Sequence, residues 1–103
     1  MNRNNPILYI VIPCYNEEKM ITQTIKKLPK YIDHIIAVND ASTDDTIGVL
    51  NKLKKQNNRL IVVDNETNQG VGGALIAGYN YAIEHTKATA IGIVAGDDQF
   101  DST

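Results

Sequence analysis

The stretch ILYIVIPCYNEE, residues 7–18, decides the fold of this chain. It begins with six consecutive apolar residues, Ile7–Ile12, and turns polar directly after Pro13. An unbroken apolar run of this length is typical of a strand buried on both faces of a sheet. Because such strands occur mainly in parallel sheets covered by helices, we expect helices between the strands of this protein.

The remaining chain repeats this alternation. Apolar runs predict further strands over 34–39, 59–64 and 89–94. Helices are predicted over 17–28, after STDDT at residues 42–46, and after the glycine-rich segment NQGVGG at 68–73. The order predicts an α/β domain over residues 1–103, with a Rossmann-like, open, mostly parallel sheet of about four strands and helices on both faces.

Composition narrows the class of protein. A hydrophobic content of 43% with 21% charged residues indicates one soluble globular domain. The formal net charge of −2 gives no basic footprint for nucleic acid. The single Cys14 cannot form an internal disulfide, which fits a reducing cytoplasm. No apolar run approaches the ~20 residues of a membrane span. We therefore expect a cytoplasmic protein without a nucleic-acid partner.

Three polar loops, PCYNEE, NDASTDD and GDDQFD, follow the carboxyl ends of predicted strands. Ligands of open α/β sheets bind at that edge. In the first loop, Pro13 fixes its own φ and Tyr15 offers a flat face that could stack on a base. Glu17 and Glu18 are expected in the first helical turn, where the helix dipole favours carboxylates, so this loop also has a purely structural explanation.

Asp40 follows the second predicted strand. Its carboxylate could accept a hydrogen bond from a base or a ribose hydroxyl, or cap the nearby backbone as an Asx turn. Ser42 or Thr43 is expected to cap the second helix, with Asp44 and Asp45 in its first turn.

The segment NQGVGGALIAG is not a dinucleotide fingerprint, because Leu75 stands where the third glycine belongs and the segment follows the third strand. It also lacks the Gly-Lys-Ser/Thr of a P-loop. Its small residues would let a helix packing Ala74, Leu75, Ala82 and Ile83 approach the sheet, and the helix start remains available to an anion.

The last loop carries three carboxylates, Asp97, Asp98 and Asp101. Acids held this close repel one another unless they meet a cation, and oxygen ligands suit Mg²⁺ or Mn²⁺. The structural alternative is a solvated terminal loop.

Taken in order, VIPCYNEE, VNDASTDDT, NQGVGGALIAGY and VAGDDQFD resemble the N-terminal nucleotide-binding half of family 2 glycosyltransferases with a GT-A type fold. The similarity is greatest to the dolichyl- or polyprenyl-phosphate sugar transferase branch and runs from about residue 7 to the end. It implies a UDP- or GDP-linked sugar as donor. It also implies transfer with inversion to a lipid phosphate such as polyprenyl phosphate, or to another acceptor.

The resemblance also implies roles for individual residues. The nucleotide pocket would be lined by Pro13, Tyr15, Glu17, Asp40 and Gly70, with Asp40 on the base. A divalent metal, Mn²⁺ or Mg²⁺, would be held on the diphosphate by Asp97, Asp98 and Gln99.

Three positions depart from the family pattern. Ala95 stands where the first acid of the metal motif is often found, and Asn39 replaces the first of two paired acids. Val71 stands where many relatives carry a Lys or Arg. The chain also stops at Thr103, before an acceptor-binding half that would supply the catalytic base. We therefore expect a truncated enzyme, inactive alone, whose full-length form could associate with a membrane.

Two alternatives to an enzyme fragment stay open. The chain could be a nucleotide-binding module without catalysis. It could also be a self-associating fragment with no ligand, forming homo-oligomers through an unpaired sheet edge.

Overall fold

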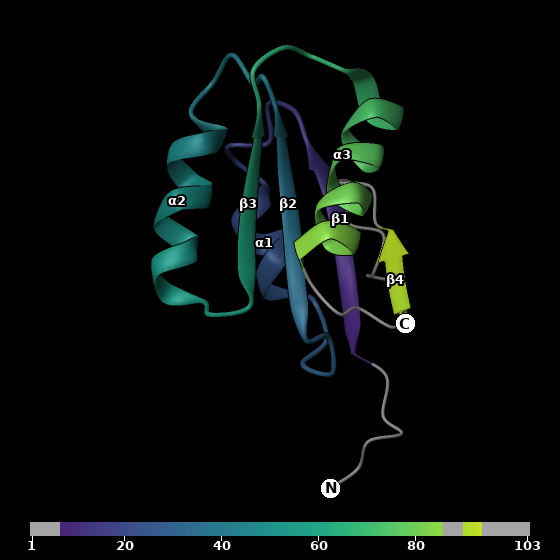
Figure 1. Cartoon of the computed structure of the whole chain (residues 1–103). Coiled ribbons are helices and arrows are strands. Elements are labelled where there is room, and N and C mark those ends of the chain that lie inside the picture. Colours follow the sequence, from purple (N-terminus) through teal and green to yellow (C-terminus); the bar gives the residue numbers. More distant parts are fainter. Residues whose placement is uncertain (1–6, 86–89, 94–103) are drawn as a thin grey trace, which may run out of the picture.

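The computed structural model describes residues 7–85 and the strand over 90–93. Strands and helices alternate along the chain (Figure 1). The strands are β1 (Leu8–Cys14), β2 (His34–Asp40), β3 (Leu60–Asn65) and β4 (Ala90–Ile93). The helices are α1 (Ile21–Lys26), α2 (Thr46–Gln56) and α3 (Gly70–His85).

The four strands form one parallel sheet in the order β3-β2-β1-β4. Strand β1 lies inside the sheet, where Val11 pairs with Ile36 of β2 on one side and with Ile93 of β4 on the other. All strands therefore end at the same edge. The predicted α/β class and parallel sheet are confirmed.

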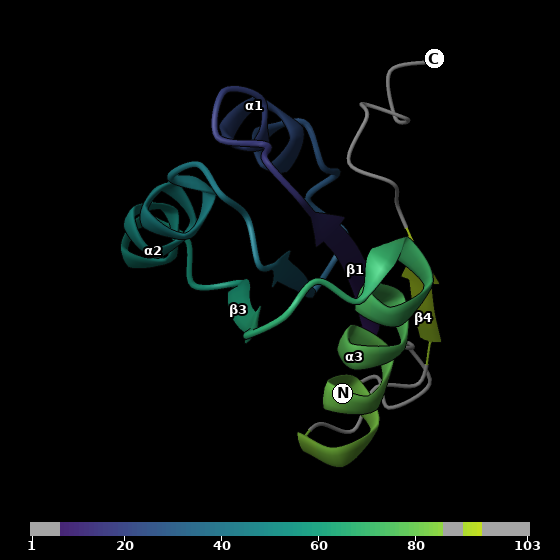
Figure 2. The ribbon, with the colours of Figure 1, turned by 90° about the horizontal axis from the view of Figure 1, so that it is seen from above.

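The helices cover both faces of the sheet. Figure 2 shows α1 and α2 on one side and α3 on the other, where it packs over β1 and β2. Alternate residues of β1 point to the two sides, so that Ile12 packs with the first pair of helices and Val11 with α3. This two-sided burial explains why the strand is apolar at every position.

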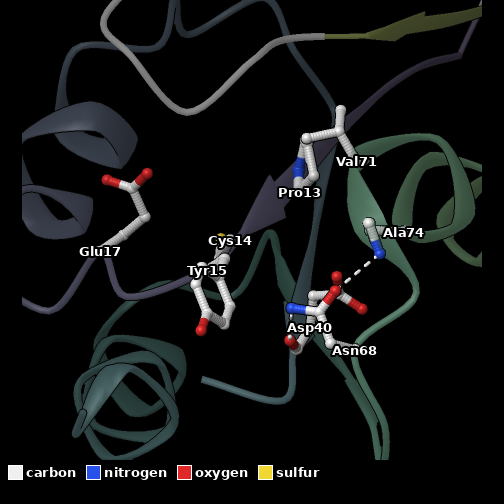
Figure 3. A pocket seen from close by; sticks show the side chains of 9 residues that line it. Pro13, Cys14, Tyr15, Glu17, Asp40, Asn68, Val71 and Ala74 are labelled. Atoms are coloured by element: carbon white, nitrogen blue, oxygen red, sulfur yellow. Dashed lines mark hydrogen bonds between the residues drawn. The ribbon is translucent and has the colours of Figure 1, made fainter. Parts of the chain in front are cut away.

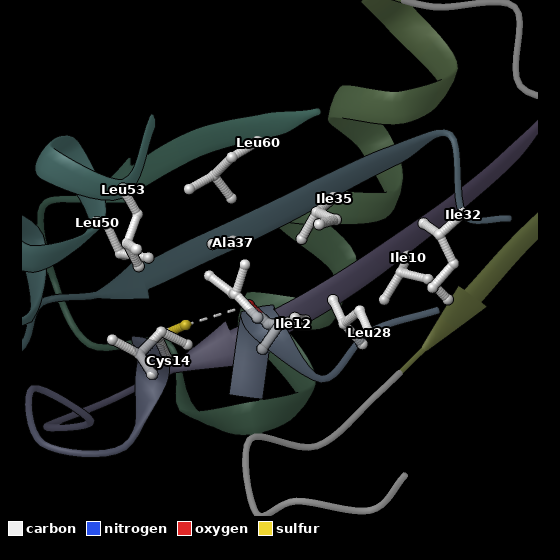
Figure 4. Close-up of a cluster of buried hydrophobic side chains, with 12 residues drawn as sticks. Ile10, Ile12, Cys14, Leu28, Ile32, Ile35, Ala37, Leu50, Leu53 and Leu60 are labelled. Carbon is white, nitrogen blue, oxygen red and sulfur yellow. Dashed lines mark hydrogen bonds between the residues drawn. The ribbon is translucent and has the colours of Figure 1, made fainter. Parts of the chain in front are cut away.

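A large aliphatic cluster fills the space beneath α1 and α2 (Figure 4). Ile25 of α1 and Leu50 of α2 meet Ile12 and Ile35 of the sheet there. Removing an aliphatic side chain of this size from water contributes about 1.5–3 kcal/mol. This cluster fixes the position of the two helices that follow β1 and β2.

Both helix starts differ from their predictions. Helix α1 begins at Ile21, so Glu17 and Glu18 lie in the preceding loop and not in its first turn. Helix α2 begins at Thr46, and the carboxylate and hydroxyl side chains of residues 42–45 lie before it. The reason is that the side chains of Glu18, Ser42, Thr43 and Asp44 bond the neighbouring loop, as described below.

Helix α3 packs differently from its prediction at one position. Ala74 and Ala82 are buried as expected, but Ile83 is 55% exposed. Gly78 takes the sheet-facing position, where an added Cβ would meet Val11 Cγ1 and lie 3.1 Å from Val38 Cγ2. The helix therefore lies so close to the sheet that only small residues fit beneath it.

Among residues 7–85 and 90–93, no helix is long and apolar enough to cross a membrane.

Candidate functional site

A pocket of about 380 Å³ opens at the carboxyl edge of the sheet (Figure 3). Its walls come from the end of β1 and the following loop, from the end of β2, and from the start of α3. The lining residues are Pro13, Cys14, Tyr15, Glu17, Asp40, Asn68, Gly70, Val71 and Ala74. The structure thus brings together all five residues expected to bind a nucleotide.

The β1 side of the pocket combines a buried floor with an exposed ring. Pro13 and Cys14 end the strand and are buried, whereas Tyr15 is 47% exposed. Burial, with a smaller effect of the Glu17 carboxylate, raises the pKa of the Cys14 thiol to about 12. Cys14 is therefore protonated near neutral pH and is not a nucleophile.

Asp40, the last residue of β2, is 3% exposed and organises the approach to α3. Its Oδ1 accepts hydrogen bonds from the Gln69 N–H at 2.8 Å and from Asn65 Nδ2 at 3.1 Å. Its backbone carbonyl accepts a bond from Asn68 Nδ2 at 3.3 Å. The carboxylate therefore fixes the backbone at Gln69, 29 residues away, instead of capping its own turn, and it also lines the pocket.

The start of α3 depends on Gly70 and Asn68. Gly70 has φ +76°, a left-handed conformation that favours glycine, and an added Cβ would meet nothing within 4 Å. The Gly70 N–H donates to Asn68 Oδ1 at 2.9 Å. Asn68 was missed by the sequence reasoning, although an Asn two residues before the first helical glycine is a recognisable Asx signal.

The loop between β1 and α1 is joined to the loop between β2 and α2. Asn16 Oδ1 accepts the N–H groups of Thr43 and Asp44, and the Asn16 N–H donates to Ser42 Oγ. Glu18 Oε1 accepts the N–H of Asp45. Sequence reasoning placed Ser42 or Thr43 in a helix cap and Glu18, Asp44 and Asp45 in first helical turns. It overlooked Asn16 and missed the pairing between the loops.

Hydrogen bonds also stabilise the Asp44 carboxylate. Desolvation opposes its ionisation, but bonds donated by the side chain and backbone of Thr46, and by the backbone of Glu18, outweigh that effect. Together they lower the pKa of Asp44 below its usual value. Asp44 therefore acts as an ionised acceptor between the loops at neutral pH.

The charge of the pocket is negative in the part of the chain that the structure describes. Its lining includes the carboxylates of Glu17 and Asp40 and no Lys or Arg. Within the same described ranges no group of three or more His, Cys, Asp or Glu side chains could hold a metal ion. The expected metal ligands Asp97, Asp98 and Gln99 lie outside the described residues.

A comparison with family models matches residues 9–103 to glycosyl transferase family 2. The chain belongs to this family. The resemblance seen in the four sequence segments is thereby confirmed, and the match covers nearly the whole chain.

Curated relatives of this family 2 chain include two enzymes of known reaction. A UDP-N-acetylglucosamine–dolichyl-phosphate N-acetylglucosaminyltransferase from Methanococcus voltae is 37% identical over 91 residues, which cover 76% of this chain and 36% of that enzyme. A poly(ribitol-phosphate) beta-glucosyltransferase from Bacillus spizizenii is 37% identical over 98 residues, covering 90% and 15%. The chain thus spans about a third of the length of the first relative and less than a sixth of the second.

Solved structures share the fold. A mannosyltransferase from Pyrobaculum calidifontis, in complex with GDP-Man and Mn²⁺, superposes with a TM-score of 0.76 at 22% identity. The match covers 92% of this chain and 28% of the mannosyltransferase chain. S. aureus TarS 1-349 in complex with UDP gives a TM-score of 0.66 at 28% identity, over 88% and 27%. The predicted GT-A type fold of the family 2 chain is confirmed.

Proposed function

We propose that this chain is the nucleotide-sugar-binding part of a glycosyltransferase and that the pocket at the carboxyl edge receives the nucleotide. The observation that carries the proposal is the convergence of Tyr15, Asp40 and Gly70 on one pocket from three separate segments. A volume of about 380 Å³ lies within the range of small-molecule sites. A UDP- or GDP-linked sugar is the donor, in keeping with the nucleotides bound by two structural relatives.

Each pocket residue has a chemical role in this proposal. The exposed ring of Tyr15 stacks on the base, and Asp40 accepts a hydrogen bond from a base N–H. Two N–H bonds already fix the orientation of Asp40 through Oδ1. Gly70 lets the backbone approach the diphosphate without a Cβ in the way. Pro13 and Glu17 complete the lining.

The donor's diphosphate requires positive charge that the described lining does not supply. Asp97, Asp98 and Gln99 would hold Mn²⁺ or Mg²⁺, since carboxylate and amide oxygens suit both ions. The metal, when bound, supplies electrostatic stabilisation of the departing diphosphate. Mn²⁺ accompanies GDP-Man in the Pyrobaculum mannosyltransferase.

The reaction of the whole enzyme is attack of an acceptor oxygen on the anomeric carbon, with inversion. A polyprenyl phosphate is one acceptor, because the Methanococcus relative acts with dolichyl phosphate. The Bacillus relative, named for poly(ribitol-phosphate), argues that acceptors differ among enzymes sharing this domain. No residue of this chain is assigned as catalytic base, and we expect the chain to be inactive alone.

Binding is tested by thermal-shift titration of the chain with UDP, GDP and their sugars, with and without Mn²⁺. A ligand at 100 times its dissociation constant should add roughly 2.7 kcal/mol of stability. We expect the shift for UDP or GDP to require Mn²⁺ and to disappear in Asp97→Ala. The nucleosides uridine and guanosine carry no phosphate charge, so their weaker binding should not depend on metal. No shift with any of these ligands would contradict the proposal.

The two other functions receive less support. A binding module without catalysis predicts the same thermal shifts, and it would be distinguished by a longer chain that still fails to transfer sugar. The comparisons lend no support to self-association through the sheet edge. Light scattering tests it, since a homo-oligomer would exceed the 11.4 kDa of one chain.

A further inference from the structure

We propose that Asn16 is the positioning residue of the pocket: it fastens the β1–α1 loop to the β2–α2 loop and thereby holds Tyr15 and Glu17 in place. Asn16 does not line the pocket itself, but its two chain neighbours do. The effect on nucleotide affinity rests on the proposed function. The fastening of the two loops does not.

The side chain of Asn16 concentrates three contacts on one atom. Its Oδ1 accepts the Thr43 N–H at 2.8 Å, the Asp44 N–H at 3.3 Å and the Thr43 hydroxyl at 3.3 Å. Its own N–H donates to Ser42 Oγ at 3.0 Å. The partners lie 26–28 residues away in sequence, so these bonds join two separate loops.

The backbone of Asn16 is also distinctive. Its φ is +54°, in the left-handed region that few residues other than Gly, Asn and Asp adopt readily. This conformation bends the chain between Tyr15 and Glu17, whose side chains point apart in Figure 3. A substitution of Asn16 that removes either the left-handed bend or the Oδ1 acceptor would therefore displace Tyr15 or Glu17 in the pocket.

Neighbouring contacts make the junction continuous. The Glu17 N–H donates to Thr46 Oγ1 at 2.9 Å, and the Glu18 N–H donates to Asp44 Oδ2 at 3.3 Å. The Asp45 N–H donates to Glu18 Oε1 at 3.0 Å. Three consecutive residues, 16–18, thus each bond the β2–α2 loop or the first residue of α2 through their backbone N–H.

The junction is anchored in the sheet. The Ser42 hydroxyl donates to Asn39 Oδ1 at 2.6 Å, and Asn39 Nδ2 donates to Asp64 Oδ1 at 2.8 Å. Asn39 is buried in β2 and Asp64 belongs to β3. A chain of hydrogen bonds therefore runs from β3 through the buried Asn39 of β2 to Asn16, and it ties the β1–α1 loop to the sheet.

The test compares Asn16→Gly with Asn57→Gly. Glycine at position 16 keeps the left-handed bend and removes only the side-chain acceptor. Asn57 offers a matched control, because its Oδ1 also accepts one backbone N–H, from Arg59 at 2.9 Å, but in the turn before β3. Two readouts are measured on the whole chain: amide hydrogen exchange by NMR, and the affinity for UDP and GDP with Mn²⁺ by calorimetry.

We expect Asn16→Gly to accelerate exchange of the Thr43 and Asp44 amides about tenfold and to weaken nucleotide binding about tenfold, as loss of hydrogen bonds of ordinary strength predicts. Asn57→Gly should lower the melting temperature without changing either readout. Ser42→Ala, which removes the acceptor of the Asn16 N–H, should act in the same direction with a smaller effect. Ser42→Ala also provides the test if Asn16→Gly does not fold.

The outcomes separate the two proposals. If the unaltered chain binds no nucleotide, the proposed function fails, while the exchange data still decide whether Asn16 fastens the loops. If nucleotide binds and Asn16→Gly changes neither readout, the inference is overturned. Faster exchange with unchanged affinity would also overturn it, because Asn16 would then hold the loops without positioning the pocket.

Discussion

The two faces of the sheet are covered in opposite ways. Beneath α1 and α2, branched aliphatic side chains such as Ile25 and Leu50 fill a thick layer. On the other face, the residues that α3 itself buries are Ala74, Gly78 and Ala82, so the helix lies close against the strands. Large side chains stabilise the face under α1 and α2, whereas small residues allow the close contact between α3 and the other face. The first face should therefore be sensitive to truncation and the second to enlargement.

The tightness of the first face can be measured through Cys14, which belongs to its cluster. Burial raises the pKa of this thiol from 9.0 to about 12, so its thiolate is about a thousandfold scarcer than that of an unshifted thiol below pH 9. We expect a thiol reagent at pH 8 to modify native Cys14 far more slowly than an exposed cysteine until denaturant is added. A Tyr79→Cys variant supplies an exposed control on α3 and should gain one fast-reacting thiol. Rapid labelling of native Cys14 would contradict this packing.

Truncation of the first face is tested by Leu50→Ala. Leu50 is fully buried in the cluster, so the variant should lose about 2–5 kcal/mol of unfolding free energy. Urea denaturation measures the loss. The exposed neighbour Lys52→Ala should stay within about 0.5 kcal/mol. A loss below 1 kcal/mol at Leu50 would mean that the layer collapses around the missing side chain.

Enlargement of the second face is tested by Gly78→Ala. The new Cβ would collide with Val11 Cγ1, so overpacking should cost about 1–3 kcal/mol although alanine favours helix. Gly72→Ala is the matched control, because its Cβ would meet nothing within 4 Å. It should leave stability unchanged or raise it by less than about 1 kcal/mol. Equal effects of the two substitutions would remove the distinction between the faces.

The smallest effect is expected on the outer side of α3. Ile83 is 55% exposed, so Ile83→Lys should change the unfolding free energy by less than about 0.5 kcal/mol. A larger loss in urea denaturation would show that Ile83 contributes to packing, as the apolar pattern of the sequence first suggested.

The strands and their parallel arrangement were predictable because each is an unbroken apolar run between helical patterns. The exposure of Ile83 was not predictable, because the apolar pattern of a helix does not depend on the volume of its side chains. Ala74, Gly78 and Ala82 face the sheet since larger residues do not fit there. The prediction chose the sheet-facing residues of α3 by hydrophobicity, whereas the short distance between the helix and the sheet selects them by size.

The site was predicted in part for a similar reason. Pro13, Tyr15, Glu17, Asp40 and Gly70 were singled out by their places after strands and in motifs, and the structure gathers them around one pocket. Asn16 and Asn68 were overlooked, and the acids before α2 were assigned to its first turn. Caps are argued from nearby residues, whereas the Asn16 bonds reach 26–28 positions along the chain.

The central place of β1 in the sheet also bears on how the protein is made. Among the described strands it is synthesised first, and it pairs with β2 and with β4, whose last described residue is Ile93. At roughly 5–20 residues per second, the ribosome needs several seconds between the completion of β2 and that of β4. During that interval one side of β1 has no strand to pair with. The strand that carries Pro13 and Cys14 to the pocket therefore keeps one edge unpaired while α2, β3 and α3 are made.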